Sequence, residues 1–315
     1  MKVGGERNYG YGKQLKWAGK QAIKEYFVGD RFSSTASHLF RWEWFCDWLE
    51  TIGIKDARDI TKNTILDFGD ELAELVRDQE MKVSYAQNLI SSVNVILRSM
   101  RQDDKMWVSP SGIVGHRTNF RLEPPIHMDI VEVNKLQSRL IALGYPVVAA
   151  LVGLARALGM RFKECLLFDA ICALKQARRS GEIEVSRGTK GSHARIITVG
   201  GGKAIEVIDL AASFQVGDCL IPSGLTFLEF RNYVYHHFYQ AGGTRFHDFR
   251  ASFACDLYRS ITGCPAPVSR ENGDPAPSKE VDRGARLVVS QQLGHHRIEV
   301  VGAYIGPILN RLKKS

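Results

Sequence analysis

Six polar residues in the second half of the chain occur in an order that constrains its fold: Arg161, Lys190, His247, Arg250, His295 and Tyr304. The most distinctive part of the set is Leu293-Gly294-His295, which Tyr304 follows nine residues later. If the six act together, folding has to bring side chains from distant parts of the sequence to one place. The sequence therefore predicts that all six residues belong to one catalytic domain.

These residue types form a coherent site for phosphoryl transfer without a metal. Tyrosine is a weak nucleophile at its free pKa of about 10, and it becomes useful when neighbouring groups stabilise the charge that develops. Two arginines suit the non-bridging oxygens of a phosphodiester, because a guanidinium is always charged and donates two parallel hydrogen bonds. A lysine crowded by other cations can protonate a leaving oxygen, and histidines can donate hydrogen bonds or move protons near neutral pH.

Each residue also has an ordinary structural explanation. Arg161 could form a buried ion pair with Glu164 one turn later, and Lys190 could be a solvated lysine in a turn. His247 and Arg250 could form a polar cluster at a helix N-terminus. Independent explanations of this kind, falling in this order, are improbable together. The set therefore favours a catalytic interpretation.

The ordered set resembles that of the tyrosine recombinases, the phage-integrase type of DNA strand-exchange enzyme. The resemblance is detailed in the C-terminal part of the chain and holds only in outline in the N-terminal part. It implies a mainly α fold with a small β-hairpin or sheet, in which a helical core-binding domain precedes an α+β catalytic domain. The implied function is site-specific recombination, with integration or excision of a mobile element.

The resemblance assigns the chemical steps to four residues. Tyr304 would attack the scissile phosphate, form a 3′-phosphotyrosyl bond and free a 5′-hydroxyl. Arg161 and Arg250 would hold the non-bridging oxygens, and Lys190 would protonate the leaving 5′-oxygen. The phosphotyrosine keeps the energy of the phosphodiester, so rejoining would need neither ATP nor a metal ion.

The remaining roles are supporting ones. His247 and His295 would assist by hydrogen bonding and proton transfer, with His247 also the candidate base for Tyr304. Glu164 would ion-pair with Arg161 or pack beneath it. No cofactor and no metal is expected, and adjacent histidines such as His236-His237 do not have metal-ligand spacing.

The implied partner is duplex DNA at a recombination or attachment site, bound by a homodimer per site and by a homotetramer in the synapse. An accessory DNA-bending or directionality protein would be a further partner. Several alternatives stay open: a chromosome- or plasmid-dimer resolving recombinase, a type IB topoisomerase with similar chemistry, and a DNA-binding protein with a decayed site. An inserted loop and a basic N-terminal extension favour a mobile-element integrase.

The composition is compatible with this function. The net charge of +8 fits a polyanionic partner, and the 44% hydrophobic content is typical of a globular protein. None of the six cysteines forms a C-x-x-C pair, so we expect reduced thiols. The sequence has neither a recognisable signal peptide nor an apolar run long enough for a membrane span. A cytoplasmic, nucleoid-associated prokaryotic protein with no membrane partner is expected.

Four segments are expected along the chain. Residues 1–30 would form a basic arm or helix, and residues 31–106 a helical core-binding domain with apolar residues at helical spacing. Residues 107–127 contain three prolines and two glycines, which predict a linker, and the catalytic domain would span 128–315.

Two local features of the catalytic part carry further expectations. The turn around Gly188-Thr189-Lys190-Gly191 lies between β-branched segments, which places Lys190 near the tip of a β-hairpin. The Pro- and Gly-containing stretch 260–287 predicts an inserted, mobile surface loop. The partly apolar tail 305–315 could dock on a neighbouring subunit or on its own domain.

Overall fold

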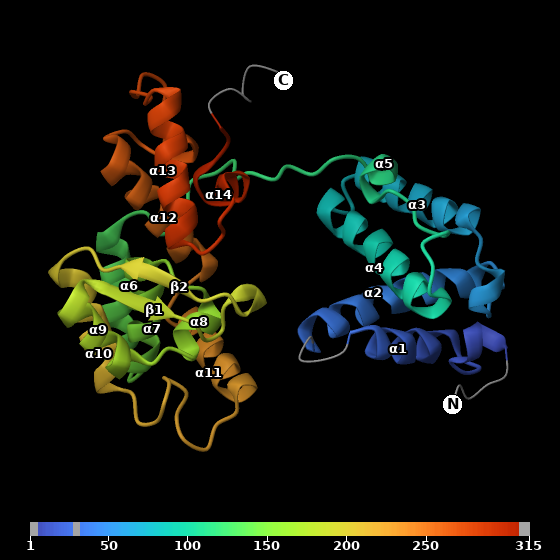
Figure 1. Ribbon diagram of the computed structural model, residues 1–315, viewed down its shortest axis with the longest axis horizontal. Helices are drawn as coiled ribbons and strands as arrows, with labels where there is room; N and C mark the ends of the chain where they lie inside the picture. Colours follow the sequence, from blue (N-terminus) through green and yellow to red (C-terminus); the bar gives the residue numbers. More distant parts are fainter. Residues whose placement is uncertain (1–5, 28–31, 309–315) are drawn as a thin grey trace. The chain divides into compact units, whose positions relative to one another are not determined.

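The computed structural model describes residues 6–27 and 32–308 and divides the chain into two compact units, Met1–Thr118 and Asn119–Ser315 (Figure 1). Each unit has its own apolar core. The mainly α fold with one small sheet that the sequence predicts is confirmed. The tail beyond Ile308, on which the docking expectation depends, lies outside the described residues, as do residues 1–5 and 28–31.

The first unit is a helical bundle organised around α4. Its elements are η1 (Arg7–Gly10), α1 (Leu15–Tyr26), α2 (Phe32–Thr51), η2 (Ala57–Asp59), α3 (Lys62–Arg77), α4 (Val83–Arg101) and α5 (Pro110–Val114). Helix α4 packs against α1, α2, α3 and α5. Thr61 caps α3 through a reciprocal pair of hydrogen bonds with Thr64, which satisfies backbone groups that the first turn leaves unpaired.

The segment expected as a basic arm contains a helix of this bundle. Helix α1 packs against α2 and α4, and Leu15, Ala18, Ala22 and Ile23 are buried in the common core. A Cβ at Gly19 would lie 2.2 Å from Nε1 of Trp42, so the two helices approach closely because Gly19 has no side chain. Of the lysines of α1, Lys16 and Lys24 are exposed and Lys20 is half-buried.

The segment expected as a linker is divided between the two units. Helix α5 packs against α3 and α4 in the first unit. Arg121 belongs to the second unit: its amide donates to the Gly302 carbonyl at 2.8 Å, and its Nη2 donates to Asp248 Oδ2 at 2.7 Å. The boundary between the units falls after Thr118, within the segment 107–127 that the sequence predicts as a linker.

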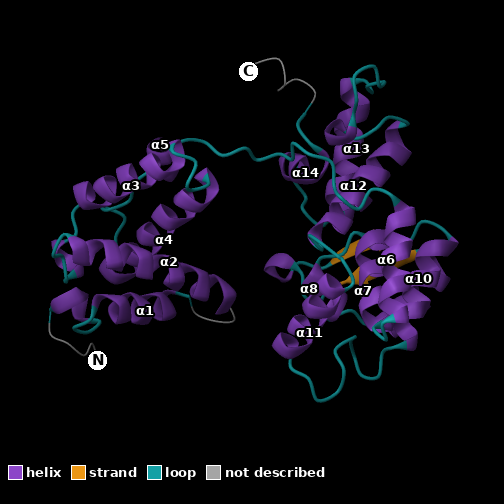
Figure 2. Cartoon of the chain, turned by 180° about the vertical axis from the view of Figure 1, so that it is seen from behind, coloured by secondary structure: helices purple, strands orange, loops and turns teal. Residues whose placement is uncertain are grey.

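The second unit is helical with one two-stranded antiparallel sheet, whose small size Figure 2 shows. Its helices are α6 (Ile130–Ala142), α7 (Pro146–Leu158), α8 (Phe162–Leu166), α9 (Ala170–Ser180), α10 (Gly202–Ser213), α11 (Phe227–Gln240), α12 (His247–Thr262), α13 (Lys279–Gln292) and α14 (Ile298–Ile305). Strands β1 (Glu182–Val185) and β2 (Arg195–Thr198) pair with Ile183 opposite Ile197.

Helix α7 forms the centre of this unit. It packs against α6, α8, α10, α11 and α12, and nearly all of its residues are buried. Pro146 lies in its first turn, where a missing N–H costs nothing. Gly159 ends it with φ +60°, and a Cβ there would meet the ring of Phe253 at 2.3 Å. This ending delivers Arg161 to the point where α7 and α12 meet.

The insertion predicted as a surface loop is partly a core element. Helix α12 continues to Thr262, and a short 3-10 turn, η4 (Pro267–Ser269), follows. Ala266 and Val268 are buried in one cluster with Tyr304 and Ile305 of α14. Residues 271–276 are exposed. The prediction of a surface loop over 260–287 is therefore wrong at both ends. Ala266 and Val268 pack in the core beside α14, and residues 279–287 belong to α13, in which Ala285 and Arg286 are buried.

Among the described residues, no helix combines the length and the apolar character that crossing a bilayer requires.

Candidate active site

The site gathers side chains from the ends of four helices. Arg161 is the residue before α8, and His247 and Arg250 occupy the first turn of α12. His295 follows α13, and Tyr304 lies in the last turn of α14. Histidine and arginine at positions i and i+3 lie on the same side of a helix, so the first turn of α12 presents both together.

Arg250 is the centre of the site and its side chain is fully buried. Its Nη2 donates to the Leu293 carbonyl at 2.6 Å, and its Nη1 donates to the Gly159 carbonyl. Its Nε lies 3.4 Å from the hydroxyl of Tyr304. Burial and the neighbouring positive charges lower the pKa of Arg250 to about 10, so it stays charged at neutral pH. The charged guanidinium of Arg250, held by these hydrogen bonds, therefore lies beside the hydroxyl of Tyr304.

Tyr304 lies between Arg250 and two histidines. Its hydroxyl is 3.0 Å from Nε2 of His295, which is also 3.4 Å from Nη2 of Arg250. The ring of His247 lies 5.5 Å from that of Tyr304, centroid to centroid. Only 6% of Tyr304 is exposed. A nearly buried hydroxyl with an imidazole in hydrogen-bond range can lose its proton to that imidazole when the ring is neutral.

Glu164 supports the arginines from beneath. Its carboxylate is fully buried and accepts from Nη1 and the backbone amide of Arg161, each at 2.6 Å. Nη1 of Arg250 is 3.9 Å away. Burial would raise the pKa of Glu164, but Arg195, Arg161 and Arg250 outweigh it and lower the pKa to about 2. The carboxylate is therefore charged at neutral pH.

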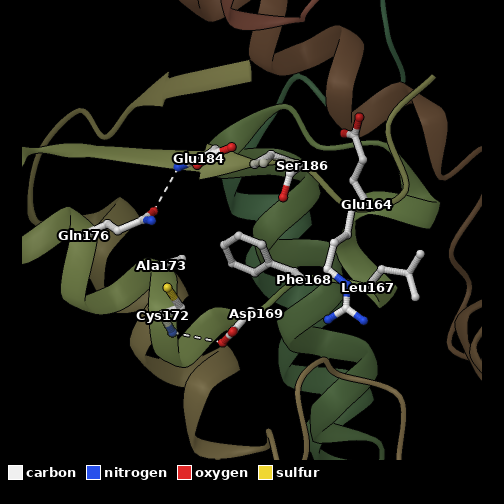
Figure 3. A pocket seen from close by; sticks show the side chains of 11 residues that line it. Glu164, Leu167, Phe168, Asp169, Cys172, Ala173, Gln176, Glu184 and Ser186 are labelled. Atoms are coloured by element: carbon white, nitrogen blue, oxygen red, sulfur yellow. Dashed lines mark hydrogen bonds between the residues drawn. The ribbon is translucent and has the colours of Figure 1, made fainter. Parts of the chain in front are cut away.

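A cavity of about 200 Å³ lies next to the site, and Glu164 is one of the residues that line it. Figure 3 shows the Glu164 carboxylate pointing away from Phe168, Asp169 and Cys172, which line this cavity. Asp169 there caps α9 through the amide of Cys172 at 3.0 Å. The Glu164 carboxylate thus binds the arginines, while the other residues that line the cavity lie between positions 167 and 187.

Comparison with known proteins identifies the fold. No protein family matches the sequence, and no curated protein is detectably similar to it. Solved structures are similar: the Tn1549 transposon integrase in complex with a circular intermediate DNA has a TM-score of 0.57 and 12% identity, covering 92% of this chain and 94% of that one. A lambda integrase dimer bound to a core site has a TM-score of 0.56 and 12% identity, covering 93% and 76%. The chain has the tyrosine-recombinase fold.

Within this recombinase fold, Lys190 lies between the two strands, whereas the other five predicted residues lie at or near the ends of helices. It lies in η3 (Lys190–Ser192), in the connection between β1 and β2, and is exposed. Its charge contributes, after burial, Arg250 and Arg161, to lowering the pKa of His295. A lysine on an exposed connection can move toward a substrate more easily than the buried arginines can.

One residue of the recombinase-fold site was missed by the sequence analysis. Arg195, at the start of β2, is buried and donates two hydrogen bonds to Glu164, at 2.6 and 2.8 Å. The signal was the alternation of β2, in which Arg195 and Ile197 point inward while Ile196 and Thr198 point outward. An arginine in an inward position of a strand needs a buried anionic partner.

Within the described ranges, no three His, Cys, Asp or Glu side chains are grouped as a metal ion would require. Five of the six cysteines are buried and Cys172 is exposed; all six are free thiols.

The histidines of the recombinase-fold site predict an acid-sensitive stability. Burial, Arg250 and Arg161 lower the pKa of His295 to about 4, against about 6.5 in an unfolded chain. Between these values the unfolded chain binds more protons, so the free energy of unfolding should fall as pH falls. Urea unfolding at pH 7 and pH 5 should show a smaller loss for His295→Asn than for the wild type. The same substitution at exposed His236 should leave the loss unchanged, and equal losses in all three proteins would contradict the assignment.

Proposed function

We propose that this protein is a site-specific DNA recombinase that cuts and rejoins duplex DNA through a phosphotyrosyl intermediate at Tyr304. The observation that carries the proposal is the position of the Tyr304 hydroxyl, 3.0 Å from His295 and 3.4 Å from Arg250, in a chain with the recombinase fold. A tyrosine beside a buried guanidinium is suited to attack a phosphate whose charge the guanidinium stabilises.

In this mechanism Tyr304 attacks phosphorus and the 5′-oxygen leaves, so that a 3′-phosphotyrosyl bond forms as the phosphodiester breaks. Arg161 and Arg250 stabilise the non-bridging oxygens, and Glu164 holds Arg161 in place. Lys190 supplies the proton that the leaving oxygen needs. Attack by a 5′-hydroxyl from a partner duplex then reverses the chemistry and completes strand exchange, without ATP or a metal ion.

The base for Tyr304 is His295 in this proposal, whereas the sequence resemblance favoured His247. Nε2 of His295 lies in hydrogen-bond range of the hydroxyl, and its pKa of about 4 leaves it neutral at pH 7. Burial, followed by the charge of Arg250, also lowers the pKa of His247. His247 is free to donate to a phosphate oxygen once DNA is bound.

Duplex DNA is the proposed substrate, bound by two protomers per site and four in the synapse. The similar structures support this: one is a transposon integrase in complex with a circular intermediate DNA, and another is an integrase dimer bound to a core site. Both are integrases, and we propose integration or excision of a mobile element as the role of this chain. The net charge of +8 fits a substrate whose phosphates dominate affinity.

The proposal is tested by capturing the intermediate. The protein is incubated, with EDTA present, with DNA fragments from around its own gene, and complexes that survive SDS are isolated and sequenced. We expect a covalent adduct at Tyr304 by peptide mapping, together with a free 5′-hydroxyl that a polynucleotide kinase can label. Failure to form an adduct with DNA that the protein binds, or an adduct that needs metal, would contradict the proposal.

A second measurement separates a recombinase from a topoisomerase of similar chemistry. Two duplexes that carry the captured site should be joined through a Holliday junction by a recombinase. Relaxation of supercoiled DNA without any junction would instead identify a topoisomerase.

The role of Lys190 gives a substrate-dependent prediction. A sulfur in the 5′-bridging position leaves as a thiolate and needs no proton. Lys190→Ala should therefore cleave ordinary DNA slowly and be largely restored on the sulfur-bridged substrate. Lys175→Ala, which removes an exposed lysine of α9, is the matched control and should behave as wild type on both. Equal slowing of Lys190→Ala on both substrates would remove it from the proton-donor role.

A further inference from the structure

Arg195 has more contacts with the site than an ordinary buried ion pair requires. Its two terminal nitrogens bind both oxygens of Glu164, at 2.6 and 2.8 Å, with side-chain exposures of 2% and 0%. Its Nε donates to the Gln292 carbonyl at 3.0 Å. One guanidinium thus joins α8, which follows Arg161, to the end of α13, which precedes His295.

The turn that carries His295 is packed directly on Arg195. Gly294 has φ +67°, and a Cβ at this position would lie 2.7 Å from Cδ of Arg195. The side chain of Gln292 accepts from the amide of Thr198 at 3.1 Å, so β2 and the end of α13 are held together at a second point. Glycine in Leu293-Gly294-His295 is therefore required both by its backbone angle and by the arginine beside it.

Three arginines lie near the Glu164 carboxylate, and only two of them bind it directly. Arg161 and Arg195 contact it directly, while Nη1 of Arg250 lies 3.9 Å away and its other nitrogens face Leu293, His295 and Tyr304. A buried carboxylate attracts every cation in reach, and the attraction is strong where water is excluded. While Arg195 occupies both carboxylate oxygens, Arg250 remains directed at Tyr304.

We propose that Arg195 is a positioning residue for strand cleavage: it occupies Glu164 so that Arg161 and Arg250 present their guanidinium groups to the same phosphate. This inference rests on the proposed function, because it concerns the same site. Without Arg195, the carboxylate lacks its main partner and draws Arg250 across the 3.9 Å gap, away from Tyr304 and His295. Arg195 itself does not touch the reacting phosphate.

The test compares two substrates that differ in the charge of the scissile group. A methylphosphonate carries a methyl in place of one non-bridging oxygen and is neutral, so it depends little on the arginine clamp. Arg195→Gln should cleave the ordinary phosphodiester about tenfold more slowly than wild type, less than the factor of about 10² expected for a direct donor. It should cleave the methylphosphonate at close to the wild-type rate. Equal slowing on both substrates, as a merely loosened fold would give, overturns the inference.

A double variant tests the proposed cause. Removing the charge of Glu164 as well leaves no carboxylate to capture Arg250. Glu164→Gln keeps a side-chain oxygen that can accept from Nη1 of Arg161. Arg195→Gln combined with Glu164→Gln should therefore cleave the phosphodiester faster than Arg195→Gln alone, although two buried residues have been changed. A double variant no faster than Arg195→Gln would overturn the inference.

The control is Arg178→Gln, which removes an exposed arginine paired with Asp209 in the same unit. It should match wild type on both substrates. Thermal unfolding accompanies each assay. If Arg195→Gln does not fold, Arg195→Lys keeps the charge but loses the paired hydrogen bonds, and the same substrate comparison applies.

The two claims fail in different ways. If the wild type forms no adduct with any DNA, the proposed function and this inference are both overturned. If the wild type forms the adduct and Arg195→Gln cleaves the phosphodiester at the wild-type rate, only the inference is overturned.

Discussion

Replacing Tyr304 with phenylalanine should abolish the covalent protein–DNA adduct while leaving DNA binding intact. The substitution keeps the buried ring and removes only the hydroxyl that lies 3.0 Å from His295. Because the apolar contacts of the ring remain, the fold should be little affected. SDS-resistant adduct on a nicked suicide substrate is the measurement for cleavage, and gel retardation is the measurement for binding.

The matched control deletes a different phenol hydroxyl in the same unit. Tyr239 on α11 is 56% exposed and stacks on Tyr235, and Tyr239→Phe should form adduct as the wild type does. An adduct that persisted in Tyr304→Phe would assign the nucleophile to another residue.

Replacing Arg250 with alanine should slow cleavage by a factor of about 10² or more, the scale for losing one preorganised donor to a transition state. The substitution should also lower the stability of the fold, because Arg250 binds the carbonyls of Gly159 and Leu293. Leaving the Gly159 carbonyl without this donor should lower the free energy of unfolding by about 1–3 kcal/mol. The Leu293 carbonyl keeps a second donor, Nη2 of Arg161, at 3.4 Å. Cleavage is therefore measured well below the thermal midpoint of the variant.

Arg250→Lys separates the effect on cleavage from the effect on stability. Lysine keeps the charge but cannot donate in the planar, forked geometry, so cleavage should stay slow while some stability returns. Arg178→Ala, at an exposed pair with Asp209, should change neither quantity measurably. Cleavage at the wild-type rate by Arg250→Ala would exclude it from the phosphate clamp.

Much of the candidate site follows from local sequence rules. The spacing of His247 and Arg250 places both in one helical turn, and the apolar run that ends at Gly159 sets the position of Arg161. The hairpin around Lys190 was predictable from a polar turn between β-branched residues. Each of these expectations depends on contacts between residues close together in the chain.

The features that were missed depend on contacts between distant residues. Arg195 pairs with Glu164 across 31 positions, and its strand has only four residues, which is too short for alternation to stand out. Val268 was assigned to a surface loop because prolines surround it. It is buried because Gly306 has no side chain: a Cβ there would lie 2.8 Å from the Val268 amide. Such complementarity has no signature in either segment alone.

The hydroxyl of Tyr304, its imidazole partner and the buried guanidinium all come from one polypeptide. This has a genetic consequence. Alleles that encode Tyr304→Phe and Arg250→Ala should not complement each other when expressed together, because no subunit would inherit a whole site. In the proposed assembly of subunits on DNA, each inactive allele should instead be dominant-negative, because a product that keeps the proposed DNA binding would occupy places that working subunits need.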